Sequence, residues 1–303
     1  MKKRIFAVLL ALALTVSLLP MGALAAEGDT INMAKFIEAV EEAEYNYDGQ
    51  GVTVEWSPSS GCWQNHTAES DNCYLKNHKP GTEPDGNTPQ RLQSNNAQYQ
   101  IFSGVEGQVT IKNVTFVFKA TDVEICTGTG TGNSWGEADT TYNAELQFLN
   151  AGGLIIENCD FTNVIVSPYC KGNNTAENTV TTITNCSFSD VYNAYAIKDI
   201  YTGSAYITGC KFDRISGAIY FEGDTARSEI KISGNTFNNV DQYAAPGKEN
   251  TRGVIQLSSS FTMGDNTTIT IEDNEIVGNT PEAGMPVIRQ RCDLDGHEII
   301  GWT

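Results

Sequence analysis

Basic residues are scarce in this 303-residue chain. Lys and Arg together number 19, against 37 Asp and Glu, and the formal net charge at pH 7 is −18. Such an excess of acid provides no basic surface to attract phosphate groups, which excludes binding to nucleic acid or to an anionic membrane through charge. Charged residues of both signs make up only 18% of the sequence, whereas glycine contributes 28 residues, and this composition favours an elongated β protein.

Long apolar runs are missing beyond the amino-terminal segment. Residues 1–25 have the pattern of a signal peptide: three basic residues at positions 2 to 4, an apolar run from Ile5 to Leu19, and a small-x-small cleavage site ending at Ala25. Cleavage removes three positive charges and no negative one, so the mature chain carries a net charge of −21. No later run approaches the ~18–20 residues of a membrane span. We therefore expect a secreted or cell-surface protein whose mature chain does not insert into the membrane.

Helical periodicity is rare as well, and a short repeat takes its place. Six segments align without gaps, and the three middle intervals between them are 27, 24 and 25 residues. The segments are TIKNVTF (110–116), IIENCDF (155–161), TITNCSF (182–188), YITGCKF (206–212), KISGNTF (231–237) and TIEDNEI (270–276). Each has Ile at its second position, and five of the six end in Phe. Repetition at a fixed period is the signature of a solenoid.

A bend is expected inside each repeat. The fourth position holds Asn, Gly or Asp in every segment, and these residues tolerate left-handed backbone angles. Three residues after the Phe row comes another apolar row of Val or Ile. Further strands are expected at Tyr99 to Phe102, Glu145 to Phe148, Ala196 to Lys198, Ala218 to Phe221, Val254 to Leu257 and Val287 to Gln290. Short strands without crossover helices predict an all-β right-handed parallel β-helix, a single solenoid with internal Ile, Phe and Val ladders.

The eight cysteines divide into two kinds. Cys159, Cys186 and Cys210 occupy the fifth position of successive repeats, where the pattern favours a stack of buried free thiols over one bridge within the row or metal chemistry. Cys62 and Cys73 lie in a polar loop, where a disulfide is favoured over a zinc site because no C-x-x-C pair is present. The pairing of Cys126, Cys170 and Cys292 stays open.

The expected organisation has a helical cap and two decorated loops. Residues 26–48 contain an amphipathic pattern beginning after Asn32, which we expect to cover the open end of the column. Residues 49–303 are expected to form the β-helix, with a first strand at Val52 to Trp56 and inserted loops at 59–96 and 120–143. The loops contain Trp63 and Trp135, which are candidates for ligand binding because long loops on a rigid scaffold commonly carry function.

These features together resemble a known family. The apolar-x-N-C/N-x-F coil, the segment from Phe36 to Val40 and the strand from Gly51 to Val54 are similar to the right-handed parallel β-helix of the pectate-lyase-like superfamily. More narrowly, they resemble β-helix regions of secreted and surface proteins of Gram-positive gut bacteria. The resemblance spans roughly residues 30–290. It implies the fold, but not one activity, since that superfamily contains lyases, hydrolases, adhesins and stalks.

The catalytic motifs of the enzymes in that superfamily are missing. Polygalacturonase-type hydrolases carry N-T-D, D-D, G-H-G and R-I-K, and the nearest strings here are Gly296-His297-Glu298 and Arg214-Ile215-Ser216. Pectate-lyase-type enzymes carry W-I-D-H and R-x-P-x-x-R, and neither occurs. Several Asp residues sit at bends, but none forms a multi-oxygen calcium loop, so calcium has little support and no cofactor is expected.

One set of outward residues is the main candidate site. In register along the later strands are Gln147, Lys198, Tyr220, Gln256 and Arg289, with Glu222, Ser258 and Arg291 two residues further on. We call this set the outer stripe. Amide, aromatic and cationic groups on a flat β face suit a carbohydrate. Lys198, Tyr220, Glu222 and Arg289 are the candidates if the site is catalytic, with Lys or Arg as the base of a β-elimination. A solvated face without function is the remaining alternative.

The sequence therefore favours a non-catalytic, adhesin-like binding module whose partner is a glycan or a host or microbial surface protein. Two alternatives remain, a polysaccharide lyase or glycoside hydrolase, and a structural stalk. No L-P-x-T-G sorting signal follows Arg291, and the last coil lacks an expected cap, so we expect the chain to be part of a larger surface protein. The ligand and the oligomeric state are not specified by the sequence.

Overall fold

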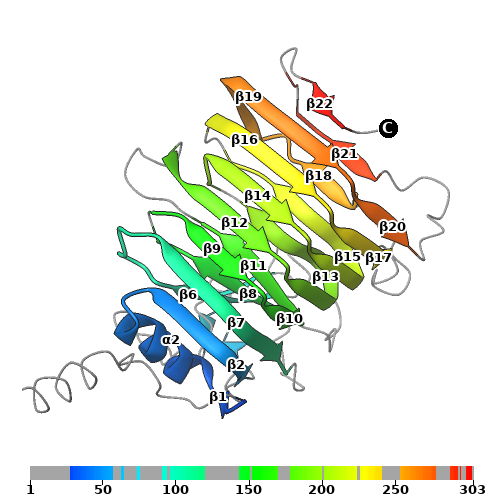
Figure 1. The fold of residues 1–303 in the computed structure, drawn as a ribbon. Coiled ribbons are helices and arrows are strands. Elements are labelled where there is room, and N and C mark those ends of the chain that lie inside the picture. The colour runs from blue at the N-terminus through cyan, green and yellow to red at the C-terminus, as the bar shows by residue number, and fades with distance from the viewer. Residues whose placement is uncertain are drawn as a thin grey trace, which may run out of the picture.

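A long column of stacked strands dominates the computed structural model, with one helix at its amino-terminal end (Figure 1). The structure describes residues 28–56, 63–64, 74–75, 91–93, 96–119, 143–150, 152–169, 178–199, 201–223, 226–240, 253–277, 287–292, 294 and 298–301. Twenty strands belong to one sheet system, in which every pairing among the described residues is parallel except that of β5 with β6. The predicted all-β parallel solenoid is confirmed.

The strands form three faces. The first face consists of the first part of β7 (Val109–Phe118) with β9 (Leu154–Glu157), β12 (Val180–Thr184), β14 (Ser204–Thr208), β16 (Ala226–Ser233), β19 (Thr262–Glu272) and β22 (Ile299–Ile300). The second consists of the later part of β7 with β10 (Asp160–Thr162), the first parts of β13 (Ser187–Asp199) and β15 (Lys211–Phe221), β17 (Thr236–Val240) and β20 (Glu275–Val277).

The third face completes each coil. It consists of β6 (Asn96–Ile101), β8 (Asn143–Phe148), β11 (Val164–Pro168), the later parts of β13 and β15, β18 (Ile255–Leu257) and β21 (Ile288–Gln290). The first coil is supplied by β2 (Asn46–Trp56), which spans the first and second faces. Strand β1 (Thr30–Ile31) extends the second face by pairing with the later part of β2. Three short strands lie outside these faces: β3 (Trp63–Gln64), β4 (Tyr74–Leu75) and β5 (Arg91–Gln93).

The predicted internal ladders are confirmed. Ile111, Ile156, Ile183, Ile207, Ile232 and Ile271 pair in register from coil to coil and are buried. The rings of Phe116, Phe161, Phe188, Phe212 and Phe237 stack with centroids 4.9 to 5.1 Å apart. The ladder weakens at its end, because Ile276 replaces Phe in the last repeat and is 38% exposed.

The predicted bend is also confirmed. Asn113, Asn158, Asn185, Gly209, Gly234 and Asp273 all have φ between 53° and 65°. A second left-handed row, formed by Asn163, Asp190, Arg214 and Asn239, lies between the second and third faces. This row was not predicted from the sequence, although three of its four members are Asn or Asp, because Arg214 interrupts the pattern. The guanidinium of Arg214 pairs with the carboxylate of Asp190 at 2.8 Å, which helps to hold that turn.

The cysteine row forms part of the core. Cys159, Cys186 and Cys210 are buried free thiols, as favoured from the sequence. Hydrogen bonding to Cys159 and burial raise the pKa of the Cys186 thiol, and hydrogen bonding to Cys186 and burial raise that of Cys210. The row continues into Asn235, whose Nδ2 donates to the carbonyl of Ile207 at 2.9 Å. A small apolar thiol and a hydrogen-bonded amide thus fill the same place in successive coils.

Helix α2 (Met33–Glu42) covers the amino-terminal end of the column (Figure 1). Asn32 is its N-cap, with Oδ1 accepting from the backbone N–H of Lys35 at 2.9 Å. The ring of Phe36 meets that of Phe116 edge to face at 5.0 Å. Strand β2 begins at Asn46 rather than at Val52, because its first residues pair with β7 before an irregularity between Asp48 and Val52.

Candidate functional site

The outer stripe lies on the third face, and its members are in register. Lys198 pairs with Tyr220, Tyr220 with Gln256, and Gln256 with Arg289. Gln147 is not adjacent to Lys198, however, because β11 lies between their strands and places Ser167 in the row. Strand β11 was not predicted as a separate strand of the stack, because it follows β10 of the Phe161 repeat after a single turn residue. Gln100 extends the row in the opposite direction.

A chain of polar contacts runs along the row toward Lys198. Nε2 of Gln100 donates to Oε1 of Gln147 at 3.2 Å, and Nε2 of Gln147 donates to Oε1 of Glu145 at 3.0 Å. The ammonium of Lys198 then lies 3.9 Å from Oε1 of Glu145 and 3.5 Å from Oε1 of Glu222. The side chain of Glu145 is 2% exposed, whereas those of Lys198 and Glu222 are each 27% exposed. Lys198 is therefore held between a buried carboxylate and an accessible one.

The protonation states of the candidate bases follow from these contacts. Burial lowers the pKa of Lys198, but the charges of Glu145 and Glu222 raise it by more, so the net shift is upward. Burial raises the pKa of Tyr220, and its hydrogen bonds to Ser258 and Glu222 shift the pKa in opposite directions. Both shifts favour the protonated form at neutral pH, which disfavours Lys198 and Tyr220 as the base of an elimination.

Two tyrosine rings form an aromatic surface beside Lys198. The rings of Tyr195 and Tyr220 stack with centroids 5.0 Å apart and an angle of 17° between their planes. The hydroxyl of Tyr195 donates to Oε1 of Gln256 at 2.6 Å, which fixes the ring across two coils. Gly217 lies opposite Tyr195 in the pairing of β13 with β15, and the ring occupies the space that a side chain at 217 would need. Tyr195 was not among the predicted site residues, because an irregularity in β13 shifts its register.

Exposure along the stripe is uneven. Gln147, Ser167, Gln256 and Ser258 are buried although they lie on the outer row, whereas Tyr195, Lys198, Tyr220, Glu222 and Arg289 are half-buried. Within the described residues, the Oγ of Ser167 has no hydrogen-bond partner. A fully solvated face does not fit this pattern. We call the five half-buried side chains, Tyr195, Lys198, Tyr220, Glu222 and Arg289, the tyrosine patch.

A buried ion pair supports the patch from below. The guanidinium of Arg227 donates to Oδ1 of Asp199 at 3.0 Å and to the carbonyl of Glu222 at 2.7 Å. Its carbon lies 5.4 Å from the ring centroid of Phe221 and 5.3 Å from that of Phe261. Arg227 and Asp199 are both buried, so this pair anchors the turn from which Glu222 projects.

Several sequence candidates lie outside the described residues: Trp135, Cys62, Cys73, Cys126 and Cys170. Trp63 belongs to β3, but its side chain is not among those described. Arg291 is exposed, and Cys292 is half-buried. The structure therefore brings together one set of predicted residues: Lys198, Tyr220, Glu222, Gln256 and Arg289. The positions of the Trp63 and Trp135 side chains relative to this set are not described.

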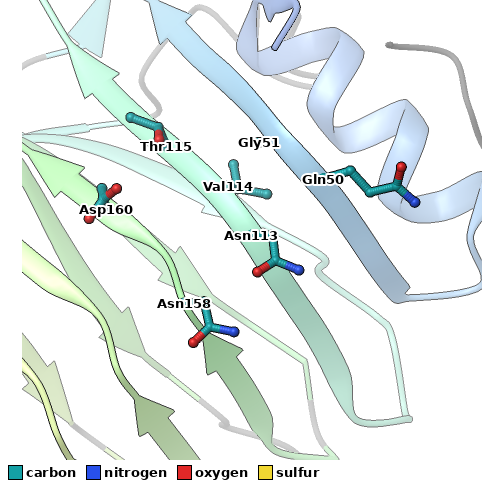
Figure 2. A pocket seen from close by; sticks show the side chains of 7 residues that line it. All are labelled: Gln50, Gly51, Asn113, Val114, Thr115, Asn158 and Asp160. Carbon is teal, nitrogen blue, oxygen red and sulfur yellow. The ribbon is translucent and has the colours of Figure 1, made fainter. Parts of the chain in front are cut away.

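A hollow lies at the bend near the amino-terminal end of the column. It has a volume of about 560 Å³ and is lined by Gln50, Gly51, Asn113, Val114, Thr115, Asn158 and Asp160. Figure 2 shows these side chains spread over three neighbouring coils, with Asn113 and Asn158 placed one above the other. In the part of the chain that the structure describes, no three His, Cys, Asp or Glu side chains are arranged to hold a metal ion.

No helix among the described residues is long and apolar enough to cross a membrane.

Comparison with known proteins identifies the fold family. The model of the family described as "Right handed beta helix region" matches residues 142–294, which include most of the third face and the whole tyrosine patch. No curated protein and no solved structure matches the chain. The matched region covers half of the sequence, and the strand pairing agrees with it throughout. The chain belongs to the right-handed β-helix family.

Proposed function

We propose that the protein is a secreted or cell-surface β-helix module that binds a neutral glycan through the tyrosine patch without cleaving it. The observation that carries this proposal is the stacked pair of Tyr195 and Tyr220 next to the Lys198 ammonium, which two carboxylates hold in place. An aromatic ring packs on the apolar face of a sugar, while fixed donors and acceptors bind its hydroxyls. Export is supported by the pattern of residues 1–25.

The charge of the patch favours a neutral ligand. The patch contains the cations Lys198 and Arg289 and the carboxylate Glu222, and with the buried Glu145 beside Lys198 the formal charges sum to zero. The rest of the mature chain carries a large negative charge, which repels a polyanion. An acidic polysaccharide could bind only if Arg289 and Arg291 together outweighed this repulsion. A neutral hexose or pentose polymer is not subject to this charge repulsion.

One contact keeps a hydrolase as a second candidate. The carboxylate oxygens of Glu145 and Glu222 each contact Lys198, so they lie within about 7.4 Å of each other, the total of the two distances, and hydrolases place their two carboxyl groups in this range. Glu145, however, is almost completely buried and accepts a hydrogen bond from Gln147. This burial favours a positioning role for Glu145 over contact with a substrate.

The experiment is a glycan array probed with the mature chain, followed by calorimetry on the strongest ligands. Tyr220→Ala and Lys198→Met should each weaken binding about ten-fold or more. Matched controls come from the first face: Tyr206→Ala removes a tyrosine bonded to Glu229 at 2.6 Å, and Lys231→Met removes a lysine paired with Glu272 at 2.9 Å. Both controls should leave binding unchanged.

Three results would overturn the proposal. Reducing ends released from a bound polysaccharide, and lost in Glu222→Gln, would establish a hydrolase, whereas unsaturated products lost in Lys198→Ala would establish a lyase. If no glycan binds and no product forms, the structural stalk becomes the better explanation.

A further inference from the structure

The two ends of the column differ in what covers them. At the amino-terminal end, helix α2 covers the core, and the strand edges are paired, β2 with β1 and β6 with β5. At the opposite end lie β20, β21 and β22 (Figure 1). Among the described residues, each of these three strands pairs on one side only, β20 with β17, β21 with β18 and β22 with β19. Such an edge is a template for pairing with another chain.

The apolar core is open at the same end. Of the described residues, three large apolar side chains are exposed, and all three belong to β20 or β22: Ile276, Val277 and Ile300. Ile288 and Ile299 are half-buried, although the isoleucines with which they pair in the preceding coil are buried. A hollow of about 480 Å³ is lined by Val287, Ile288, Gln290 and Ile299. Strand edges and apolar groups exposed together indicate an interaction surface.

Charge is distributed unequally over this end. Strand β20 carries the exposed Glu275 and no basic residue, and the exposed Asp273 precedes it at the bend. Strand β21 carries Arg289 and no acidic residue, and the exposed Arg291 follows it. The second face therefore ends in acidic groups and the third face in basic groups. A second copy of the chain offers the complement of each.

A two-fold rotation brings the two complements together. If the axis lies perpendicular to the column and passes through the first face, the rotation exchanges the second and third faces. Strand β22 then lies against its own copy, and β20 of each chain lies antiparallel to β21 of the other. In the register that pairs Ile276 with Ile288 of the second copy, both residues continue core rows. The same register places Glu275 opposite Arg289 and the exposed Val277 opposite another valine.

We propose that the mature chain forms a closed dimer through the carboxyl-terminal end of its column, with β22 against its copy and two equal contacts between β20 and β21. The dimer covers both open cores and gives each of the three strand edges a partner. Since α2 covers the other end, the assembly stops at two chains and does not grow into a fibre. The proposal does not depend on glycan binding by the tyrosine patch.

The test is sedimentation equilibrium of the mature chain over a range of concentrations, which should give the mass of two chains. Arg289→Glu and Glu275→Arg should each raise the dissociation constant of the dimer at least about ten-fold, because like charges then face each other at both contacts. Ile300→Lys should also weaken the dimer, because it places a charge in the interface. Matched controls come from α2: Lys35→Glu and Glu38→Arg make the same charge changes at the opposite end and should leave the mass unchanged.

A mixture of the two charge-reversed variants separates a lost contact from a damaged fold. Each variant alone has like charges at both contacts, whereas a heterodimer of Arg289→Glu with Glu275→Arg has opposite charges at both. The mixture should therefore regain the mass of two chains. A parent that is monomeric at every concentration, a particle larger than two chains, or a mixture that stays monomeric would each overturn the proposal. The first result would mean that something other than a second copy covers the open end.

Discussion

The ring of Tyr195 lies directly over Gly217. A Cβ built at position 217 would approach Cδ1 and Cε1 of that ring to 2.5 Å, which is closer than real Cβ contacts allow. The φ angle of Gly217 is not in the left-handed region, so the backbone does not require glycine there. Glycine is present because the ring needs the space. The flat position of Tyr195, its stacking on Tyr220 and its bond to Gln256 all depend on this missing side chain.

Gly217→Ala should therefore displace the ring and weaken glycan binding about as much as Tyr195→Ala does. Forcing a methyl group into this contact should also lower the free energy of unfolding by about 1–3 kcal/mol. Gly107→Ala is the control, because a Cβ there meets nothing within 4 Å. Calorimetry and urea denaturation measure the two effects. Unchanged binding by Gly217→Ala would show that the position of Tyr195 does not matter for the ligand.

The phenylalanine ladder should carry much of the stability of the column. Phe188 stacks on Phe161 at 4.9 Å and on Phe212 at 5.1 Å, and it is almost completely buried. Phe188→Ala should lower the free energy of unfolding by about 3–5 kcal/mol, since it opens a cavity between two coils that cannot close. Ile276→Ala, at the exposed end of the same ladder, should cost far less. Similar urea midpoints for the two variants would contradict a continuous aromatic core.

The buried ion pair predicts a marked non-additivity. Removing one partner leaves the other charge buried and uncompensated, so Arg227→Met or Asp199→Asn alone should cost about 3–5 kcal/mol. The double variant should cost less than the two single variants combined, because it leaves no uncompensated charge. Urea denaturation of the four proteins in the cycle gives the coupling energy. Simple additivity would mean that the two side chains act independently.

The thiol row predicts a pH dependence at the alkaline end. The pKa values of Cys186 and Cys210 are raised above the ordinary value of 9.0, so both thiols stay protonated in the folded state when thiols of the unfolded chain ionise. Their contribution to stability is complete below about pH 9 and is lost as the pH rises further. Unfolding midpoints at about pH 7 and about pH 10 should show a smaller decrease for Cys186→Ala than for the parent.

The same row predicts low reactivity in the folded protein. Alkylation at about pH 8 followed by peptide mapping should leave Cys159, Cys186 and Cys210 unmodified until the chain is denatured. Rapid modification of these three residues in the native protein would contradict their burial.

Much of the fold could be predicted because every coil of a solenoid needs the same residue types at the same positions. Each coil presents the same inward positions, so Ile156 and Phe161 recur at a fixed spacing in the coils above and below. The bend was predictable for the same reason, since only residues that tolerate left-handed angles occur at positions such as Asn158. Helix α2 was predictable from its amphipathic pattern and the Asn32 cap.

The site was only partly predictable. Lys198 and Tyr220 could be placed in one row because they follow the repeats at comparable distances. Tyr195 could not, because the irregularity of β13 places its ring over Gly217 in the next coil, and no local pattern reports that shift. Ser167 was missed because β11 was not recognised as a separate strand of the third face.

The sequence by itself determined the solenoid, its internal ladders and the outer stripe, because these depend on residue type at a repeating position. The tertiary structure alone decided which stripe residues stay accessible and which partners fix Lys198. Those properties depend on contacts between residues far apart in the chain, such as Glu145 with Lys198 and Tyr195 with Gln256. Stacking of the coils brings these groups into contact with one another. Only the resulting burial and ion pairs fix the position of Lys198 within the outer stripe.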